Sequence, residues 1–295
     1  MTLAPEIPGT TSRMVAVDGV RFHVRSARPA RKRRTTPVLL LHGVPETSAT
    51  WGALMADLGK DRVVLAPDLK GLGQSEAREP YDIPTLVAEL AALVLHEVDG
   101  PVDVVGHDWG GSLGLALAGA RPDLVRRLVV ESGPYREIDP VRAWYMGVAA
   151  LPVVPELAFR LTGDRIVRQA FATCWKADRA PELLDHYAAA YAPPERYTAM
   201  LGYYRAAVRP RLARAVRAML SQEAPAIGLP KVTVERSLVV WGTDDPPTPL
   251  AVGEAVARDL GESATMLTVP GVGHFPHEEA PEVVLPAIAE FLRAP

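Results

Sequence analysis

The chain has 295 residues, of which 48% are hydrophobic and 23% are charged, so it has the composition of a globular protein and not of a disordered one. Its 32 basic and 35 acidic residues give a net charge of −3, which excludes the strongly basic surface expected of a nucleic-acid-binding protein. No apolar run reaches the roughly 18–20 residues that a membrane helix needs. The length fits one large domain or one domain with an insertion.

The N-terminal segment lacks the apolar stretch of a secretory signal, and the single cysteine, Cys174, cannot form an internal disulfide. We therefore expect a cytoplasmic protein. The sequence contains no cluster of metal ligands and no phosphate-binding glycine loop, so we expect neither a metal nor an organic cofactor. The expected partner is a small molecule, with no nucleic acid or membrane, and the expected state is a monomer or a homodimer.

Alternating apolar residues on both sides of Asp18-Gly19 predict a β-hairpin over residues 14–25. From Pro37 onward, short apolar runs alternate with segments of helical periodicity. This alternation predicts an α/β fold with a mostly parallel, doubly wound sheet covered by helices on both faces. The predicted strands are 38–41, 63–66, 102–105, 128–130, 238–241 and 265–269, and the predicted helices are 51–58, 86–98, 112–120, 250–260 and 283–292.

The alternation is interrupted between about Pro134 and Pro230, where the sequence is helical in character and contains no strand pattern. We therefore predict a core domain of residues 1–134 and 230–295 and a helical cap, or lid, of residues 135–229. In open α/β sheets, ligands bind beyond the carboxyl ends of the strands. A cap inserted between two strands could close a pocket at that edge and exclude water.

The sharpest local feature is Gly106-His107-Asp108-Trp109-Gly110, which follows a predicted strand and precedes an apolar helix. This is the context of a nucleophile elbow, in which small flanking residues allow a tight turn. Asp108 occupies the nucleophile position. A carboxylate is already ionised at neutral pH, so it can attack an electrophilic carbon and form an ester without a base to activate it. A helix cap would also explain an aspartate here, but a cap does not require glycine on both sides.

Hydrolysis of such an ester needs a general base and a carboxylate that orients it, in the chain order acid and then histidine. Asp245 follows the strand 238–241, and His274 follows the strand 265–269. We therefore predict that Asp245 and His274 complete a catalytic triad with Asp108. His277 is the rival histidine, and we expect Asp244 to be a turn or capping residue.

The oxyanion that forms during hydrolysis needs backbone N–H donors, one from the residue after the nucleophile and one from the loop after an earlier strand. These positions predict Trp109 and Val44. Backbone donors leave no side-chain signature, so this prediction rests on position alone.

Five motifs spread over nearly the whole chain resemble those of the α/β-hydrolase superfamily, in the branch that uses an aspartate nucleophile. That branch includes epoxide hydrolases, haloalkane dehalogenases and fluoroacetate-type dehalogenases. The motifs are HGVPE (42–46), PDLKGLGQS (67–75), GHDWGG (106–111), WGTDD (241–245) and GVGHF (271–275).

The resemblance separates the members of this branch. Haloalkane dehalogenases usually have an asparagine at the position of Val44, where its side chain holds the halide. Fluoroacetate-type enzymes have arginines near the nucleophile, where this chain has Trp109 and Ser112. Epoxide hydrolases instead use two cap tyrosines that hold and protonate the epoxide oxygen, because an alkoxide leaving group needs an acid.

The resemblance assigns the two tyrosines to Tyr145 and Tyr204. Tyr145 stands seven residues before Pro152, as in the first cap motif. Tyr204 lies in a sequence that resembles the second cap motif, L-N-W-Y-R, with Tyr203 in place of the tryptophan and Gly202 in place of the asparagine.

The resemblance also offers an alternative triad acid, because some dehalogenases place it at the position of Glu131, and we favour Asp245. The predicted function is therefore an epoxide hydrolase that forms an aspartyl alkyl ester and releases a vicinal diol. The alternatives are a haloalkane dehalogenase and, from another class, a non-catalytic ligand-binding scaffold of the same fold.

Overall fold

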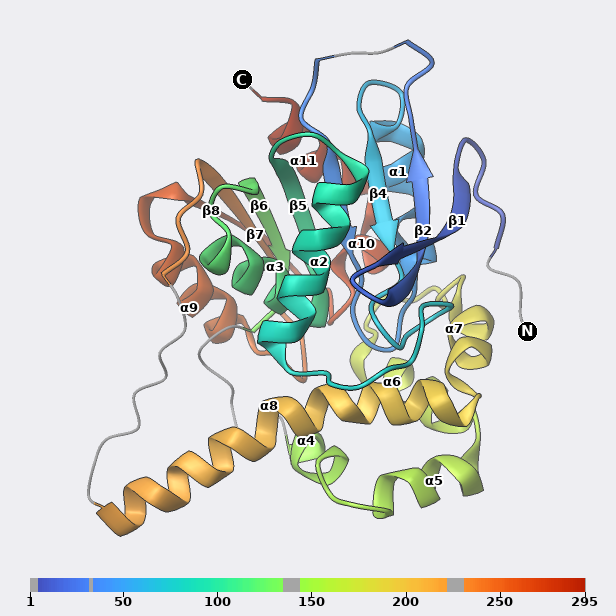
Figure 1. The fold of residues 1–295 in the computed structure, drawn as a ribbon, viewed down its shortest axis with the longest axis vertical. Coiled ribbons are helices and arrows are strands. Elements are labelled where there is room, and N and C mark those ends of the chain that lie inside the picture. Colours follow the sequence, from blue (N-terminus) through green and yellow to red (C-terminus); the bar gives the residue numbers. More distant parts are fainter. Residues whose placement is uncertain (1–4, 32–33, 135–143, 222–230, 295) are drawn as a thin grey trace.

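The structure, a computed structural model, describes residues 5–31, 34–134, 144–221 and 231–294. Its centre is an eight-stranded sheet of order β1-β2-β4-β3-β5-β6-β7-β8 (Figure 1). The hairpin β1–β2 and the β2–β4 pair are antiparallel, and the other pairs are parallel. This sheet confirms the predicted α/β fold. The strands are β1 (Thr11–Val17), β2 (Val20–Ala27), β3 (Val38–Leu41), β4 (Val64–Pro67), β5 (Val102–His107), β6 (Val125–Glu131), β7 (Arg236–Gly242) and β8 (Ala264–Val269).

Helices cover both faces of the sheet. Because side chains alternate along each parallel strand, successive residues pack against helices on opposite faces. In β3, Leu39 and Leu41 join the hydrophobic cluster under α2, α3 and α9, whereas Val38 and Leu40 join the cluster under α1 and α11. This two-sided burial explains why these strands read as continuous apolar runs. The covering helices are α1 (Gly52–Leu58), α2 (Ile83–Glu97), α3 (Trp109–Ala120), α9 (Leu250–Leu260) and α11 (Pro281–Arg293), with the short α10 (Pro276–Glu279) before α11.

The predicted elements are all present. Strand 38–41 and helix 250–260 have the predicted bounds, and the others differ at one or both ends. A 3-10 turn, η1 (Ser48–Trp51), precedes α1, and η2 (Gly261–Ser263) precedes β8. The helix predicted from residue 112 begins at Trp109, since Gly110 and Gly111 are already helical. The predicted hairpin turn has positive φ at Asp18 (+49°) and Gly19 (+78°), as a two-residue turn between right-twisted strands requires.

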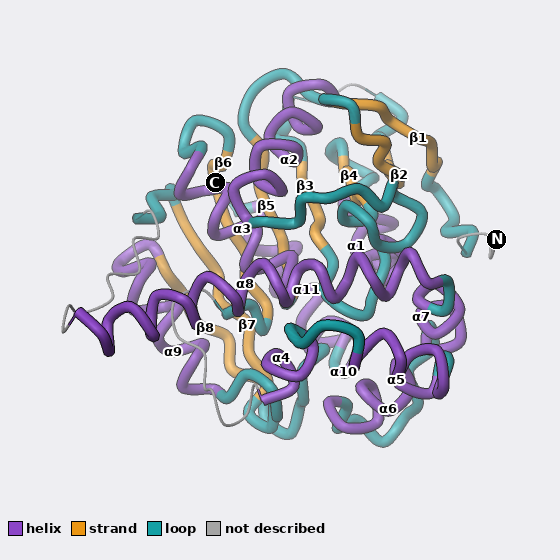
Figure 2. Tube along the Cα trace, turned by 60° about the horizontal axis from the view of Figure 1, so that its bottom comes forward, coloured by secondary structure: helices purple, strands orange, loops and turns teal. Residues whose placement is uncertain are grey.

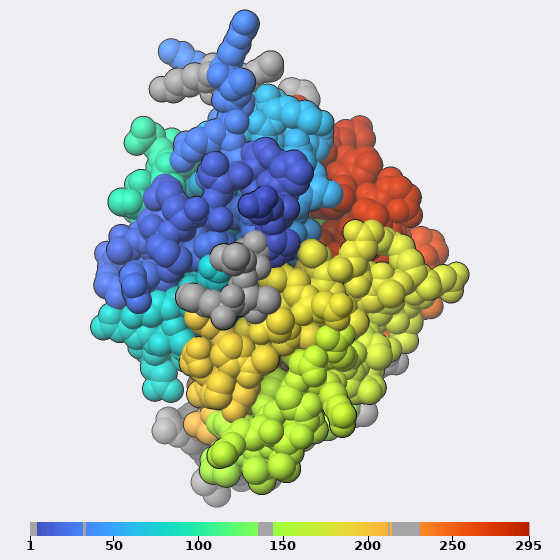
Figure 3. All heavy atoms as spheres, turned by 90° about the vertical axis from the view of Figure 1, so that its right-hand side faces the viewer, coloured from blue at the N-terminus to red at the C-terminus, as the bar shows by residue number. Residues whose placement is uncertain are grey.

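Between β6 and β7, the described residues form helices alone, and these inserted helices lie along one edge of the sheet, with the long α8 running across it (Figures 1 and 2). A space-filling view shows the inserted helices packed directly against the N-terminal part of the chain (Figure 3). The predicted domain boundaries adjoin or fall within residues 135–143 and 222–230, outside the described residues. The inserted helices are α4 (Trp144–Ala149), α5 (Val154–Thr162), α6 (Arg165–Cys174), α7 (Leu184–Tyr191) and α8 (Pro194–Ser221).

None of the helices in the described part of the chain combines the length and the apolar character that a membrane crossing requires.

Candidate active site

Asp108 sits at the sharp turn between β5 and α3, with φ of +48° and ψ of −117°. This conformation costs a non-glycine residue on the order of 1–3 kcal/mol. The turn is possible because Gly106 and Gly110, two positions before and after Asp108, have no side chains. A Cβ on Gly106 would lie 2.3 Å from the carbonyl oxygen of Gly110, and a Cβ on Gly110 would lie 2.1 Å from that of Leu41. The geometry is that of a nucleophile elbow, with the carboxylate projecting from the edge of the sheet where the inserted helices lie.

His274 and Asp245 reach this carboxylate from the ends of two further strands. The loop after β8 places His274 Nε2 3.9 Å from Asp108 Oδ1. The other ring nitrogen, Nδ1, lies 2.9 Å from Oδ2 of Asp245, which follows β7. Asp245 is itself held by Thr248, whose backbone N–H and hydroxyl donate to the carboxylate at 2.9 and 2.6 Å. The three predicted triad residues therefore lie together.

Burial and charge shift the pKa values of this group. Burial raises the pKa of Asp108, and the charges of His274 and His107 oppose that effect without cancelling it. Burial lowers the pKa of His274, but the charge and hydrogen bond of Asp245 and the charge of Asp108 outweigh it and raise that pKa to about 9. The charge and hydrogen bond of His274, with the hydrogen bonds of Thr248, more than offset burial and keep the pKa of Asp245 below its usual value. At neutral pH, His274 is protonated between two carboxylates.

Backbone N–H groups of Val44 and Trp109 act on the Asp108 carboxylate. The amide of Val44 donates to Oδ2 at 3.0 Å, and the amide of Trp109 helps to lower the pKa of this carboxyl group. The loop that carries Val44 approaches closely because Gly43 has no side chain, since a Cβ there would lie 2.7 Å from the Cβ of Asp108. The structure thus places the predicted donor Val44 on this carboxyl group, and Trp109 follows Asp108 directly as the first residue of α3.

Tyr145 and Tyr204 come together from α4 and α8, with ring centroids 6.1 Å apart and planes nearly perpendicular. The indole of Trp109 packs edge-on against Tyr204, 5.5 Å between centroids. Burial raises the pKa of both tyrosines. For Tyr204, the next largest cause of the raised pKa is the charge of Asp108. For Tyr145, the electrostatic interaction with Tyr204 comes next, followed by the charge of Asp108. Both phenols therefore keep their protons at neutral pH, within electrostatic reach of the predicted nucleophile.

Two arginines of α8 hold the end of α4. Arg205 donates to the carbonyl of Leu151 at 2.7 Å, and Arg209 donates to the carbonyl of Ala150 at 3.1 Å. Arg205 also pairs with Glu156 of α5 at 2.7 Å. These contacts fix α4 against α8, so they help to set the separation of the two tyrosines.

The neighbouring Tyr203 has a different role. Its side chain is fully buried, its hydroxyl donates to the carbonyl of Lys70 at 2.8 Å, and its ring stacks on Tyr81 with centroids 5.5 Å apart. Gly202 makes room for this packing, because a Cβ there would lie 2.4 Å from the Tyr81 ring. The two departures from the second cap motif therefore belong together as core packing.

The alternative acid, Glu131, does not contact His274. Its Oε2 lies 2.9 Å from Nδ1 of His277, the rival histidine, while its Oε1 has no hydrogen-bond partner among the described residues. Nε2 of His277 lies 3.2 Å from Glu46, which also binds His107. Glu46, His107 and His277 offer ligand atoms within 4.8 Å of one another, as a metal site would, but these atoms already pair within the group.

Sequence reasoning missed Thr248 and Glu46. Thr248 stands three residues after Asp245, a common spacing for a side chain that bonds a nearby backbone N–H, and this spacing was the available signal. Glu46 was visible as the last residue of HGVPE, but nothing local shows that its carboxylate is buried against residues 61 and 231 positions away.

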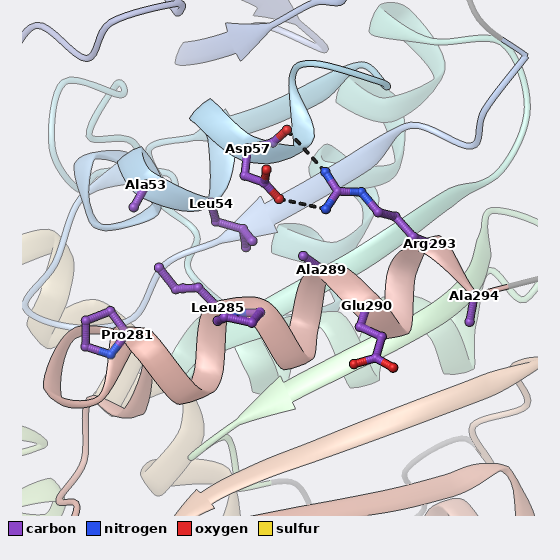
Figure 4. A pocket seen from close by; sticks show the side chains of 10 residues that line it. Ala53, Leu54, Asp57, Pro281, Leu285, Ala289, Glu290, Arg293 and Ala294 are labelled. Atoms are coloured by element: carbon purple, nitrogen blue, oxygen red, sulfur yellow. Dashed lines mark hydrogen bonds and ion pairs between the residues drawn. The ribbon is translucent and has the colours of Figure 1, made fainter.

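A groove of about 920 Å³ lies between α1 and α11, on the face of the sheet that these two helices cover (Figure 4). Its lining includes Leu54, Leu285 and Ala289, and the ion pair between Asp57 and Arg293 lies at one end, at 2.8 Å. None of the predicted site residues lines this groove.

Comparisons with known proteins agree with this architecture. The chain is 26% identical to the AB hydrolase superfamily protein YfhM of Bacillus subtilis, over 97% of this chain and 99% of that protein. It is 23% identical to epoxide hydrolase 4 of Mus musculus, over 93% of this chain and 77% of that protein. The crystal structure of the epoxide hydrolase VrEH1 from Vigna radiata superposes with a TM-score of 0.76 at 25% identity, over 98% of this chain and 99% of that chain. Residues 38–287 match the sequence profile of the alpha/beta hydrolase family, and the chain belongs to that family.

Proposed function

We propose that this protein is an epoxide hydrolase that opens its substrate through an ester on Asp108 and releases a vicinal diol. The observation that carries the proposal is the pairing of two protonated cap tyrosines with a partly buried carboxylate that is flanked by a histidine–aspartate pair. The similarity to epoxide hydrolase 4 of mouse and to VrEH1 supports the same choice within the family.

In the first step, Tyr145 and Tyr204 hydrogen-bond the epoxide oxygen. An oxygen of Asp108 attacks one ring carbon, the carbon–oxygen bond of the ring breaks, and one tyrosine gives its proton to the departing oxygen. Both tyrosines are protonated at neutral pH, so each has a hydrogen to offer to the epoxide oxygen. A halide leaves without a proton, so a dehalogenase would have no use for two such acids.

In the second step, water attacks the carboxyl carbon of the ester. Esterification removes the negative charge of Asp108, which is one cause of the raised pKa of His274, so the imidazole loses its proton more readily once the ester exists. The proton that His274 releases balances the one that the tyrosine gave. Neutral His274, oriented by Asp245, then takes a proton from water, and the amides of Val44 and Trp109 stabilise the oxyanion. The intermediate then collapses by breaking the bond between the carboxyl carbon and the ester oxygen. The departing oxygen takes the proton of the newly added hydroxyl group, so the diol leaves and Asp108 is again a carboxylate.

The test is intact-mass spectrometry of His274→Gln after mixing with a pool of aryl and alkyl epoxides and chloroalkanes. Without its base, the ester should accumulate, and the proposal expects a mass gain equal to a whole epoxide, mapped to Asp108 by peptide analysis. A gain equal to a chloroalkane minus HCl would identify a dehalogenase instead. No gain from any member of the pool would contradict the proposal and favour a binding scaffold. Asp108→Ala in the His274→Gln background is the matched control, and it should remain unlabelled.

A further inference from the structure

The carboxylate of Glu46 lies inside the molecule, directly behind the proposed site. It belongs to the loop after β3, its side chain is fully buried, and both of its oxygens are occupied. Oε2 accepts from the backbone N–H of Gly43 at 2.7 Å and lies 2.7 Å from Nδ1 of His107. Oε1 accepts from the hydroxyl of Thr50 at 2.9 Å and lies 3.2 Å from Nε2 of His277.

Three of these four partners lie next to different parts of the proposed site in the sequence. Gly43 immediately precedes Val44, whose amide points at the Asp108 carboxylate. His107 immediately precedes Asp108, and its second nitrogen, Nε2, lies 2.7 Å from the carbonyl oxygen of His274. His277 follows His274 by three residues. One carboxylate therefore joins the oxyanion loop, the nucleophile elbow and the loop of the base.

The positions of the protons in this network follow from the atoms that can only accept a hydrogen bond. The carbonyl oxygen of His274 can only accept, so Nε2 of His107 carries a proton, and Nδ1 shares a second proton with Glu46. Burial raises the pKa of Glu46, but the charges and hydrogen bonds of His107 and His277 outweigh burial and hold it well below its usual value. Burial lowers the pKa of His277, but Glu131 and Glu46 on its two sides raise it well above the usual value.

We propose that Glu46 is a positioning residue that sets the oxyanion amide of Val44 and the base His274 relative to the Asp108 carboxyl group. This inference rests on the proposed function, because it concerns the two steps of that reaction. Ester formation uses Asp108 and the cap tyrosines, none of which Glu46 contacts. Ester hydrolysis uses the Val44 amide and His274 together, and these are the groups whose loops meet at Glu46. Loss of the carboxylate should therefore slow the second step more than the first.

The variant Glu46→Gln has the same size but only one accepting oxygen, and its NH2 group can only donate. If the amide oxygen faces Gly43 and His107, the NH2 group faces Nε2 of His277 and the hydroxyl of Thr50, so His277 loses the acceptor that Oε1 of Glu46 offers it. If the amide is reversed, the NH2 group faces two donors. In either orientation, the link between the oxyanion loop and the loop of the base is broken on one side.

The matched control is Glu131→Gln. It also removes a buried carboxylate that pairs with His277, so it disturbs the charge of the same network. The Glu131 side chain does not contact Gly43 or His107, and its second oxygen has no partner among the described residues. A general loss of buried charge should affect both variants alike, whereas loss of positioning should affect Glu46→Gln alone.

The experiment is rapid-quench mass spectrometry of the Asp108 adduct in the wild type and both variants, with the epoxide that labels His274→Gln most strongly. We expect hydrolysis to slow by up to about 100-fold in Glu46→Gln, the cost that a misplacement of reacting groups by about 1 Å can reach. In the same variant, the rate of ester formation should stay within about threefold of the wild type, so that the ester accumulates. Glu131→Gln should keep the wild-type ratio of the rate constants for ester formation and ester hydrolysis.

An unchanged ratio in Glu46→Gln, or the same change in Glu131→Gln, would overturn the inference. If Glu46→Gln does not fold, Glu46→Asp and His107→Gln replace it, because each loosens the same links, and an unchanged ratio in both would have the same meaning. Absence of any ester in the wild type and in His274→Gln would instead defeat the proposed function, so the two failures are distinguishable.

Discussion

At the edge of the sheet, Asp108 and His274 are held by the backbone of strand-end turns and by buried hydrogen bonds, whereas Tyr145 and Tyr204 depend on how the inserted helices pack. The glycines around Asp108 leave the turn no room to relax, and Asp245 and Thr248 fix the imidazole. The tyrosines are placed by ring-to-ring packing and by two arginines that reach carbonyl groups across the insertion. Under the proposed function, the sheet therefore supplies the nucleophile and the base, and the insertion supplies the two acids.

The largest effect should follow from the most rigid part of the sheet. We expect Asp108→Ala to lower kcat for epoxide hydrolysis by at least about 10⁴-fold, as removal of a nucleophile from a catalytic triad does. The fold should persist, because alanine keeps the Cβ of the turn and removes a carboxylate whose charge is disfavoured by burial, and circular dichroism is the check. Activity within tenfold of the wild type would place the nucleophile elsewhere.

The tyrosines of the insertion should matter next. We expect Tyr145→Phe and Tyr204→Phe each to lower kcat by about 10²-fold, the cost of losing one hydrogen-bond donor to a developing oxyanion. Steady-state diol formation measures this effect.

Tyr203→Phe is the matched control, since it removes the same hydroxyl one position away. That hydroxyl is bonded to Lys70 and faces the core, so we expect nearly unchanged kcat and a loss of about 1 kcal/mol in the free energy of unfolding. If Tyr203→Phe lost activity and Tyr204→Phe kept it, the assignment within the insertion would be wrong.

The electrostatic coupling within the sheet can be measured without a substrate. His274 should titrate near pH 9 in the wild type, and in Asp108→Asn its pKa should fall by about one unit or more, because a neighbouring negative charge is lost. Histidine NMR with ¹⁵N labelling reports both values.

The direction in which pH changes the stability of the fold follows from the same raised pKa of His274. Because the pKa of His274 is higher in the folded state than the unfolded value of about 6.5, protonation stabilises the fold fully below that pH. This contribution is lost as the pH rises through about 9. Asp108→Asn removes the same charge that ester formation removes. An unchanged pKa of His274 in this variant would therefore argue against loss of the His274 proton on ester formation.

The smallest effect should come from the contacts that hold the insertion together. Arg205→Met removes the donor to Leu151 and the pair with Glu156, and we expect kcat to fall only a few-fold, with a stability change of about 0–1 kcal/mol, as for a partly exposed ion pair. Kinetics and thermal denaturation measure the two quantities. A loss of activity as large as that of Tyr204→Phe would show that the insertion is as rigid as the sheet.

The sequence by itself determined the elements of the core and the residues at their ends. Strands buried on both faces appear as unbroken apolar runs, and a parallel sheet brings their carboxyl ends to one edge, so Asp108, Asp245 and His274 could be named from local patterns. Tyr145 and Tyr204 could be named by resemblance alone, because aromatic residues at helical spacing are also typical of a core, as Tyr203 is.

Tertiary structure alone decided which acid meets which histidine. Glu131 ends β6 and Asp245 follows β7, and His274 and His277 are three residues apart, so the sequence allowed either pairing. The register of β6, β7 and β8 brings Asp245 to His274 and Glu131 to His277. Glu46 was recognisable only after the fold, because its partners lie on other strand ends. A buried carboxylate is defined by what surrounds it, and that depends on long-range packing and not on neighbours in the chain.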